Sequence, residues 1–237
     1  MARLIELNAD VGEGWEDEPL FSYLDRVSIA CGGHAGDESS MRAALSLARE
    51  LGVLPGAHPG YPDRSGFGRQ LITAQAGDVR RWVAGQTQVL SLLAEQVGTR
   101  LFHVKLHGAL YHAAAINADV AREVIDALHE FGRLSLICLS GAPLVGWARS
   151  AGLNVIEEAF ADRRYLDDGQ LAPRDRAGSV IDDPAVAAAQ AAHIARGEPI
   201  PTLDGGLLMR RADTLCVHGD RENALDVAKA VAAALER

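Results

Sequence analysis

Histidine, lysine and aspartate residues of this chain stand where short apolar segments end. His34 and His58 follow the second and third such segments, and Lys105 and His107 alternate with apolar residues in the fourth. Imidazoles and carboxylates transfer protons or bind metal ions, whereas an ammonium group holds an anion. These residue types therefore predict either acid–base chemistry on an anionic substrate or metal-assisted hydrolysis.

The spacing of these residues places them on common faces of extended segments. Because side chains alternate along a strand, His103, Lys105 and His107 share one face and their apolar neighbours take the other. The first and last apolar segments show the same alternation, with the pairs Asn8 and Asp10, and His218 and Asp220. Burying such groups without partners costs about 1–3 kcal/mol each, so their recurrence at segment ends favours a shared site over packing.

Four other histidines have weaker claims to a role in chemistry. His112, His129 and His193 fall in predicted helices, where we interpret them as ordinary hydrogen-bonded core or surface residues. His103 lies one step deeper in its segment than the residues that follow it, and a structural and a functional role both stay open for it.

Short apolar segments alternate with longer amphipathic ones along the whole chain, which is typical of parallel strands joined by crossover helices. The predicted strands are residues 4–7, 27–30, 53–57, 102–106, 134–139, 154–160 and 214–217. The predicted helix starts are Asp37 or Ser39 before residues 41–51, Thr73 before 79–97, Asn117 before 120–131, and Asp182-Asp183-Pro184 before an alanine-rich helix. The predicted helix ends are Gly52, Gly98, Gly132 and Gly197.

This order of elements, without a linker or an internal repeat, predicts a single α/β domain over residues 1–237. It fits either a closed β/α barrel with fewer than eight strands or an open doubly wound sheet, and we favour the seven-stranded barrel. In both folds the site lies at the carboxyl ends of the strands. Residues 161–181 lack periodicity and predict a long loop on that face, or an extra hairpin. Arg163 and Arg164 lie in this loop, where a surface ion pair is the default interpretation.

Composition limits the partners and the location of the protein. Its 237 residues carry 23 lysines and arginines against 32 aspartates and glutamates, a net charge of −9. Nucleic-acid binding is disfavoured because it depends on basic residues that displace counterions. The chain lacks the roughly 18 consecutive apolar residues of a membrane span and an amino-terminal secretory signal. We therefore predict a cytoplasmic protein, with Cys31, Cys138 and Cys216 as reduced thiols.

Metal and anion binding are competing interpretations of the histidine-rich strand ends. A divalent metal would be held by Asp10, His34 and His58, with His107 and His218 as further possible ligands, and would activate water for hydrolysis. Lys105 argues against a metal, because it shares a face with His107 and a nearby ammonium repels a cation. The prediction is therefore that no metal is bound, and that Lys105 with backbone N–H groups holds a carboxylate or phosphoryl group.

Six long motifs stand in order along nearly the whole chain. They are LNADVGEG (7–14), ACGGHAGD (30–37), GAHPGYPDRSGFGR (56–69), KLHGALY (105–111), FADRRY (160–165) and CVHGD (216–220). Together they resemble the LamB/YcsF family, whose members are the A subunits of bacterial 5-oxoprolinase. Two positions depart from the family pattern: Gly33 replaces an aromatic residue and Leu106 replaces a proline.

The resemblance implies an irregular seven-stranded β/α barrel like that of the glycoside hydrolases and deacetylases. It also implies ATP-dependent hydrolysis of the cyclic amide 5-oxo-L-proline to L-glutamate, in a multisubunit complex with subunits B and C. The chain has no G-x-x-x-x-G-K-[ST] loop, so ATP as co-substrate, accompanied by Mg²⁺, is inherited from the resemblance. No tightly bound organic cofactor is predicted, and a homo-oligomer is compatible with the sequence.

For this activity we assign roles to ten residues. The catalytic candidates are Asp10, Lys105, His107, His218 and Asp220, with the Asp220 carboxylate expected to pair with His218 and fix its tautomer. The candidates for substrate binding are Asn8, His34, His58, Tyr61 and Arg163. Two alternatives stay open: a metal-dependent amide or carbohydrate deacetylase on the same barrel, and a non-catalytic subunit that binds substrate for a partner.

Overall fold

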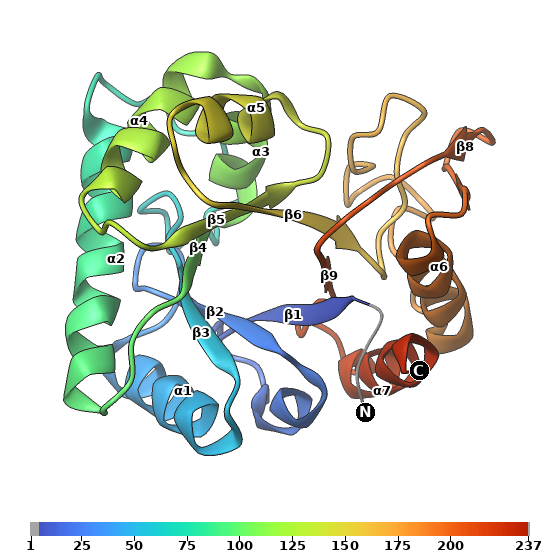
Figure 1. Cartoon of the computed structure of the whole chain (residues 1–237), viewed down its shortest axis with the longest axis horizontal. Coiled ribbons are helices and arrows are strands. Elements are labelled where there is room, and N and C mark those ends of the chain that lie inside the picture. The colour runs from blue at the N-terminus through green and yellow to red at the C-terminus, as the bar shows by residue number, and fades with distance from the viewer. Residues whose placement is uncertain (1–4, 237) are drawn as a thin grey trace.

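The computed structural model of the protein describes residues 5–236. Within them, seven parallel strands close into a barrel, in the order β1-β2-β3-β4-β5-β6-β9 (Figure 1). The strands are β1 (Glu6–Val11), β2 (Arg26–Ala30), β3 (Leu54–His58), β4 (His103–Lys105), β5 (Ser135–Leu139), β6 (Val155–Phe160) and β9 (Thr214–Cys216). The predicted barrel is confirmed, and the open sheet is wrong because β9 pairs with both β1 and β6, which leaves no edge strand among these seven.

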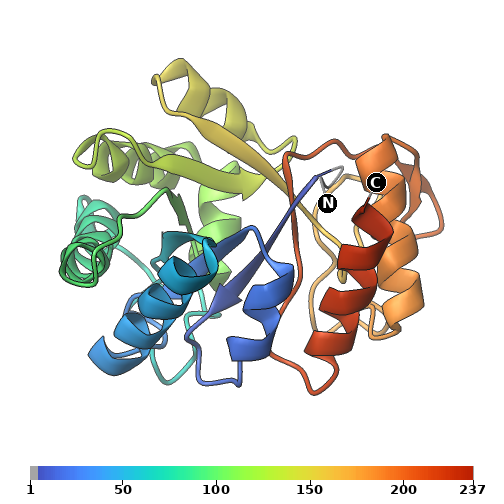
Figure 2. The same cartoon turned by 60° about the horizontal axis from the view of Figure 1, so that its bottom comes forward.

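Helices surround the barrel and connect its strands (Figure 1). They are α1 (Glu38–Leu51), α2 (Asp78–Gln96), α3 (Gly108–Ile116), α4 (Ala118–His129), α5 (Pro143–Ser150), α6 (Pro184–Arg196) and α7 (Ala224–Leu235). The ring is irregular, since only the short 3-10 helix η1 (Glu18–Tyr23) joins β1 to β2. On the other side, α6 and α7 lie side by side (Figures 1 and 2).

Most of the predicted helix boundaries agree with the structure. Asp37, Asn117 and Asp183 cap α1, α4 and α6 by accepting hydrogen bonds from the backbone of the first turn. Gly52 and Gly197 end α1 and α6 in the left-handed conformation, which glycine adopts without strain.

The predicted range of α2 agrees with the structure to within one residue at each end, but its predicted cap is wrong. Thr73 does not cap this helix, which starts at Asp78 after Gly77. Its first N–H groups are satisfied from α4, where the Glu123 carboxylate accepts from the nitrogens of Gly77 at 2.8 Å and Arg80 at 3.2 Å. A cap supplied by a distant helix leaves no local signal in the sequence.

The first strand is longer than predicted and shifted toward the carboxyl terminus. Leu4 lies outside the described residues, and β1 runs through the polar residues Asn8 and Asp10 to Val11. Polar residues are tolerated within this strand because they meet partners inside the barrel. The Nδ2 atom of Asn8, for example, donates to Oγ1 of Thr214 at 2.9 Å.

The inside of the barrel is partly polar. Ser28, Gly56 and His103 occupy matched positions on β2, β3 and β4, and the Ser28 hydroxyl lies 3.2 Å from Nε2 of His103. A side chain at Gly56 would collide with the imidazole of His103. His103 is fully buried, so its place is in the barrel core and the functional interpretation of this residue is not supported.

Residues 161–181 form the long irregular loop that the sequence predicted. Isolated antiparallel bridges, Arg163 with Val180 and Tyr165 with Leu171, fold this loop back on itself. Farther along the chain, β7 (Ile200–Pro201) and β8 (Leu207–Leu208) pair as a short antiparallel ribbon outside the barrel. Among residues 5–236, no helix is both long enough and apolar enough to cross a membrane.

Candidate active site

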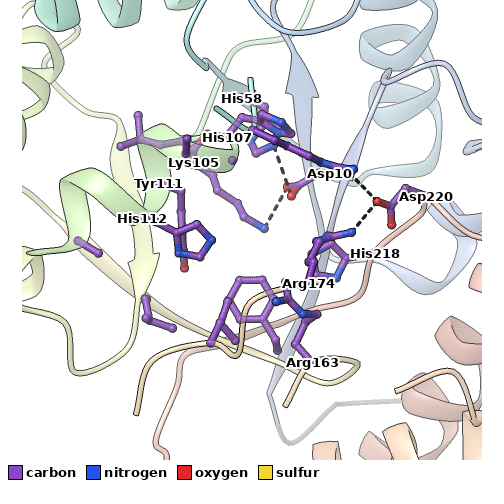
Figure 3. A pocket seen from close by; sticks show the side chains of 18 of the residues that line it. Asp10, His58, Lys105, His107, Tyr111, His112, Arg163, Arg174, His218 and Asp220 are labelled. Atoms are coloured by element: carbon purple, nitrogen blue, oxygen red, sulfur yellow. Dashed lines mark hydrogen bonds and ion pairs between the residues drawn. The ribbon is translucent and has the colours of Figure 1, made fainter. Parts of the chain in front are cut away.

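A cavity of about 450 Å³ opens at the carboxyl ends of the barrel strands (Figure 3). The structure brings together most of the residues that the sequence singled out, because β1, β3, β4, β6 and β9 all deliver side chains to this mouth. The predicted site residues that line the cavity are Asp10, His58, Lys105, His107, Arg163, His218 and Asp220.

Three other predicted site residues are not among the described residues that line the cavity. Asn8 lies deeper in the barrel, where its Oδ1 atom accepts from Nζ of Lys105 at 3.3 Å. His34 is buried behind His107, with the two rings stacked at a centroid distance of 3.5 Å. Tyr61 is buried against Trp82, with ring centroids 5.9 Å apart. We therefore no longer assign Tyr61 to substrate binding.

Lys105 lies between two carboxylates below the cavity. Its Nζ atom is 3.0 Å from Oδ1 of Asp10 and 2.8 Å from Oε1 of Glu158. Burial alone would lower the pKa of Lys105, but the neighbouring acidic groups outweigh it and raise this pKa well above its usual range. Lys105 thus stays charged, and it is neutralised by the protein itself.

This arrangement changes the role predicted for Lys105. An ammonium that is 98% buried and held by two carboxylates has little capacity left for a substrate carboxylate or phosphate. It instead fixes the orientation of Asp10, whose carboxylate also lies 3.4 Å from Nε2 of His58 (Figure 3). Burial raises the pKa of Asp10, yet its interactions with the His58 imidazole and the Lys105 ammonium bring this pKa below the usual value.

Glu13 and three histidines gather beside Asp10. Oε1 of Glu13 lies 2.8 Å from Nε2 of His34, 3.1 Å from Nδ1 of His107 and 3.6 Å from Nε2 of His58. Burial acts against ionisation of Glu13, but the neighbouring imidazoles of His107, His34 and His58 lower its pKa far below the usual value. Burial lowers the pKa of His58 to about 3, so this ring is neutral.

The structure therefore offers a different set of potential metal ligands from the one the sequence suggested. The set comprises Glu13, His34, His58 and His107, whose ligand atoms all lie within 4.8 Å of one another. Asp10 is instead engaged by Lys105. Lys105 also no longer argues against a metal, because its charge is compensated by Asp10 and Glu158.

His218 is paired with Asp162 rather than with Asp220. Its Nδ1 atom lies 2.9 Å from Oδ1 of Asp162, and its backbone nitrogen donates to Oδ2 at 3.0 Å. Burial of Asp162 opposes ionisation, but His218 and Arg221 lower its pKa far below the usual value. Such a carboxylate holds the proton on Nδ1 and leaves Nε2 of His218 free to exchange protons. The predicted pairing with Asp220 is wrong.

Arginines give the cavity a cationic wall. Asp220 accepts from Arg69 at 2.9 Å and from Arg174 at 2.8 Å (Figure 3). Arg163 lies nearby and is 96% buried, so its default interpretation as a surface residue is wrong. One of its terminal nitrogens donates to the carbonyl oxygen of Ala172 at 2.5 Å, whereas its Nε has no partner within residues 5–236. Burial lowers the pKa of Arg163 to about 10, and the group remains a cation.

Sequence reasoning missed several residues of the site. They are Glu13, Arg69, Tyr111, His112, Glu158, Asp162 and Arg174. Glu158 carried a usable signal, because a glutamate inside an otherwise apolar strand needs a buried partner. His112 is not the ordinary helical residue that the sequence suggested, since α3 turns it into the cavity (Figure 3). Arg174 lies in the loop without periodicity, and only the folded chain shows where it points.

The two departures from the family pattern have different surroundings. A side chain at Gly33 would collide with the amide of Gln86, which donates to the carbonyl oxygen of Gly60 at 2.7 Å and accepts from its nitrogen at 3.1 Å. Gln86 thus occupies the space that an aromatic residue at position 33 would need. Leu106 is buried and contributes to the cavity wall.

Comparison with known proteins identifies the relatives of this chain. The sequence model of the LamB/YcsF family matches residues 5–237. The chain belongs to the LamB/YcsF family. A member from Heliobacterium modesticaldum, named as the A subunit of 5-oxoprolinase, is 42% identical over 98% of this chain and 94% of its own length. The member of that name from Thermus thermophilus is also 42% identical, over 98% and 96%.

Solved structures agree with this membership of the LamB/YcsF family. The crystal structure of the lactam utilization protein from Thermus thermophilus superposes with a TM-score of 0.91 at 41% identity, covering 98% of this chain and 95% of that one. A putative cellobiose-phosphate cleavage protein from Enterococcus faecalis gives a TM-score of 0.51 at 9% identity, over 96% and 89% of the chains. The latter likeness concerns the barrel fold alone.

Proposed function

We propose that this chain is the A subunit of a 5-oxoprolinase, which opens the ring of 5-oxo-L-proline to give L-glutamate with cleavage of ATP, together with subunits B and C. The names of its relatives support the substrate class. The observation that carries the proposal is that one cavity is lined both by His218, which pairs with the buried Asp162 behind it, and by a buried arginine, Arg163. A small cyclic amide with a carboxylate requires both features.

Arg163 is the residue best suited to bind the substrate carboxylate. A buried guanidinium whose Nε lacks a partner among the described residues gains a charge-assisted hydrogen bond when a carboxylate enters. Arg174 adds positive charge to the same wall, although its ion pair with Asp220 offsets part of this charge. With the carboxylate held there, the lactam group would face the acidic and histidine side chains of the barrel mouth.

The chemistry of a lactam explains why ATP is needed. The amide is resonance-stabilised, and transfer of the γ-phosphoryl group to its oxygen, with release of ADP, converts this oxygen into a leaving group. Water then adds to the ring carbon, the carbon–nitrogen bond breaks, and the nitrogen leaves as the amino group of glutamate. A second water releases inorganic phosphate, so the sum is one 5-oxoproline, one ATP and two waters giving glutamate, ADP and phosphate.

The residues of the cavity would divide the proton transfers between them. His218, oriented by Asp162, would deliver a proton to the departing ring nitrogen. Asp10 is ionised and lines the cavity, so its carboxylate would accept a proton from the attacking water. Lys105 would hold Asp10 in place. ATP, with Mg²⁺, enters as the co-substrate of the complex, and the cationic wall suits a phosphoryl group as well as a carboxylate.

The test is an assay for glutamate and ADP with 5-oxoproline and ATP, run with this chain alone and with candidate B and C proteins. We expect both products in equal amounts, only when all subunits are present. His218→Gln in the reconstituted complex should abolish turnover while the melting temperature stays within a few degrees. Full turnover by that variant, or by the complex without this chain, would refute the proposal.

The same assay separates the two alternatives. Release of acetate from acetylated sugars or amides without ATP would identify a deacetylase. A chain that binds 5-oxoproline, and whose His218→Gln and Asp10→Asn variants support full turnover by the complex, would be a substrate-binding subunit without catalytic groups. The relatives named as A subunits of 5-oxoprolinase favour the proposed function over both.

A further inference from the structure

The Nε2 atom of His58 and the Nδ1 atom of His107 face each other, and the hydrogen bonds of the two rings indicate that neither atom carries a proton. Nδ1 of His58 lies 2.8 Å from the carbonyl oxygen of Lys105, and Nε2 of His107 lies 2.9 Å from that of Phe67. A carbonyl oxygen only accepts hydrogen bonds, so each of these nitrogens carries the ring proton. In neutral rings the other two nitrogens, Nε2 of His58 and Nδ1 of His107, then present lone pairs. They lie 3.0 Å apart.

Two lone pairs at this distance repel unless a cation lies beside them. The carboxylate of Glu13 adds a third electron-rich atom, because its Oε1 is 3.1 Å from Nδ1 of His107 and 3.6 Å from Nε2 of His58. Nε2 of His34 is 2.8 Å from the same oxygen. His34 can also present a lone pair there if its proton is on Nδ1, an atom with no hydrogen-bond partner among residues 5–236.

The spacing of these atoms is close to that of a metal coordination shell. Ligands at 2.0–2.2 Å from a tetrahedral Zn²⁺ ion lie about 3.3–3.6 Å from one another. Four separations within the group are 2.8–3.6 Å, and all four ligand atoms lie within 4.8 Å of one another, so small side-chain adjustments would complete the shell. A shared proton is the competing explanation, but it requires an imidazolium at a deeply buried position. His34 and His58 are 98% and 99% buried, which disfavours the charged form of both rings.

We propose that Glu13, His34, His58 and His107 bind one divalent transition-metal ion of the Zn²⁺ class at the base of the cavity. Three imidazoles and one carboxylate suit Zn²⁺ and its neighbours, whereas Mg²⁺ and Ca²⁺ prefer oxygen ligands. The carbonyl oxygens of Lys105 and Phe67 fix the ring orientations, as outer-shell partners of metal-bound histidines do. Glu13, His58 and His107 line the cavity, so the ion would be accessible from it.

Metal binding is tested on the purified full-length chain without any substrate. After treatment with a chelator and dialysis, Zn²⁺ is titrated by calorimetry near neutral pH, and Co²⁺ is added separately as a spectroscopic probe. We expect one equivalent of Zn²⁺ to bind, and visible absorption typical of four-coordinate Co²⁺. Glu13→Gln and His107→Gln should each weaken binding by about 100-fold or more. The matched control is His129→Gln, which removes a histidine whose Nε2 lies 3.1 Å from the carbonyl oxygen of Ala151, outside the cluster of Glu13 and the three histidines, and this variant should bind as the wild type does.

One measurement does not depend on the folding of any variant. In the wild-type protein, nitrogen NMR should show Nε2 of His58 and Nδ1 of His107 as unprotonated before Zn²⁺ is added and shifted by the metal afterwards. Absence of saturable binding would overturn the proposal, as would equal affinity in the wild type, Glu13→Gln and His107→Gln. A protonated nitrogen between the two rings that persists with excess Zn²⁺ would overturn it as well.

The result is independent of the proposed enzymatic activity. Binding of Zn²⁺ by a chain that supports no glutamate formation would leave the metal site in place and reject the proposed function. Turnover of 5-oxoproline by a protein that binds no metal would do the reverse. Any use of the ion in ring opening rests on the proposed function, and the titration does not require it.

Discussion

The Nζ atom of Lys105 lies 2.8 Å from Oε1 of Glu158, and both side chains are almost fully buried. Glu158 also accepts a hydrogen bond from the hydroxyl of Tyr111 at 3.0 Å. Burial raises the pKa of Glu158, although Lys105 opposes this shift. The ammonium therefore favours the ionised form of Glu158 against the effect of burial, and Lys105 is first of all a structural requirement of the site.

Lys105→Met should destabilise the protein by about 3–5 kcal/mol at neutral pH, because it leaves Asp10 and Glu158 without their cation. Carboxylates with a raised folded pKa stabilise the fold below their unfolded pKa and lose this contribution as pH rises. The loss of stability caused by Lys105→Met should therefore be smallest near about pH 4 and grow toward neutral pH, as measured by urea denaturation. The control Arg80→Met removes an exposed ion pair with Glu130 and should cost less than about 1 kcal/mol. Equal losses for the two variants at neutral pH would contradict this prediction.

His103 should make the stability of the protein depend on pH in the acidic range. Burial lowers the pKa of His103 to about 3 from the usual 6.5. The contribution of His103 to the free energy of unfolding is therefore fully present above pH 6.5. It is lost as the pH falls toward 3, because in this range only the unfolded chain takes up the proton. Between about pH 4 and 6, His103→Gln should reduce the slope of the unfolding free energy by about 1.4 kcal/mol per pH unit. An unchanged slope in chemical denaturation would show that His103 titrates normally in the folded protein.

Two glycine-to-alanine changes should act in opposite directions. Gly56→Ala should destabilise the protein by about 1–3 kcal/mol, because the added methyl group collides with the buried ring of His103. Gly85 lies within α2 with open space around it, so Gly85→Ala should stabilise the helix by about 0.5–1 kcal/mol. Thermal unfolding of both variants under one set of conditions measures the contrast. A neutral Gly56→Ala would mean that the ring of His103 does not pack against β3.

Asp162→Asn should slow the reaction, because it removes the carboxylate that orients His218 for proton transfer. An amide no longer holds the proton on Nδ1, so kcat of the reconstituted complex should fall by about 10²–10⁴-fold with little change in KM for 5-oxoproline. The pH profile of kcat should shift as well, which a purely structural role would not produce. Asp182→Asn is the control, since the carboxylate of this exposed aspartate pairs with Arg221 at 2.8 Å and Asp182 is not among the described residues that line the cavity. Identical profiles for both variants would exclude the assigned role of Asp162.

Arg163→Gln should weaken substrate binding more than catalysis. Loss of a charge-assisted hydrogen bond of about 1.5–3 kcal/mol corresponds to a rise of about 10- to 150-fold in KM for 5-oxoproline. Arg164→Gln, the neighbouring change in the same loop, should leave KM near the wild-type value. Initial rates over a range of substrate concentrations distinguish the two effects. A lower kcat at constant KM would assign Arg163 to the reaction rather than to binding.

Much of the barrel could be predicted from the sequence, because each of its elements has a local pattern. The apolar segments at 27–30, 53–57 and 134–139 agree closely with β2, β3 and β5, since burial on both faces requires continuous apolar runs. The first strand could not be placed correctly, because its polar residues are buried against partners far along the chain. Such compensation has no local sequence pattern.

The residues of the site also divide into those that the sequence could predict and those that it could not. Strand-end residues such as Asp10, His58 and His218 were predictable, because any parallel barrel directs the carboxyl ends of its strands to one mouth. Their partners were not, since pairing depends on distances of a few ångströms between segments far apart in the chain. The pairing of His218 with Asp162 and the approach of Glu13 to three histidines are examples.

The sequence by itself determined the order of strands and helices, the family and the residue types available for chemistry, because these follow from periodicity and from motifs read along one dimension. Only the tertiary structure decided which charged side chains pair with one another. It showed that Lys105 is neutralised by Asp10 and Glu158, that Tyr61 packs away from the cavity lining, and that Arg163 is buried in the wall. Electrostatic interactions and hydrogen bonds act through space over a few ångströms, so closure of the barrel was needed to assign them.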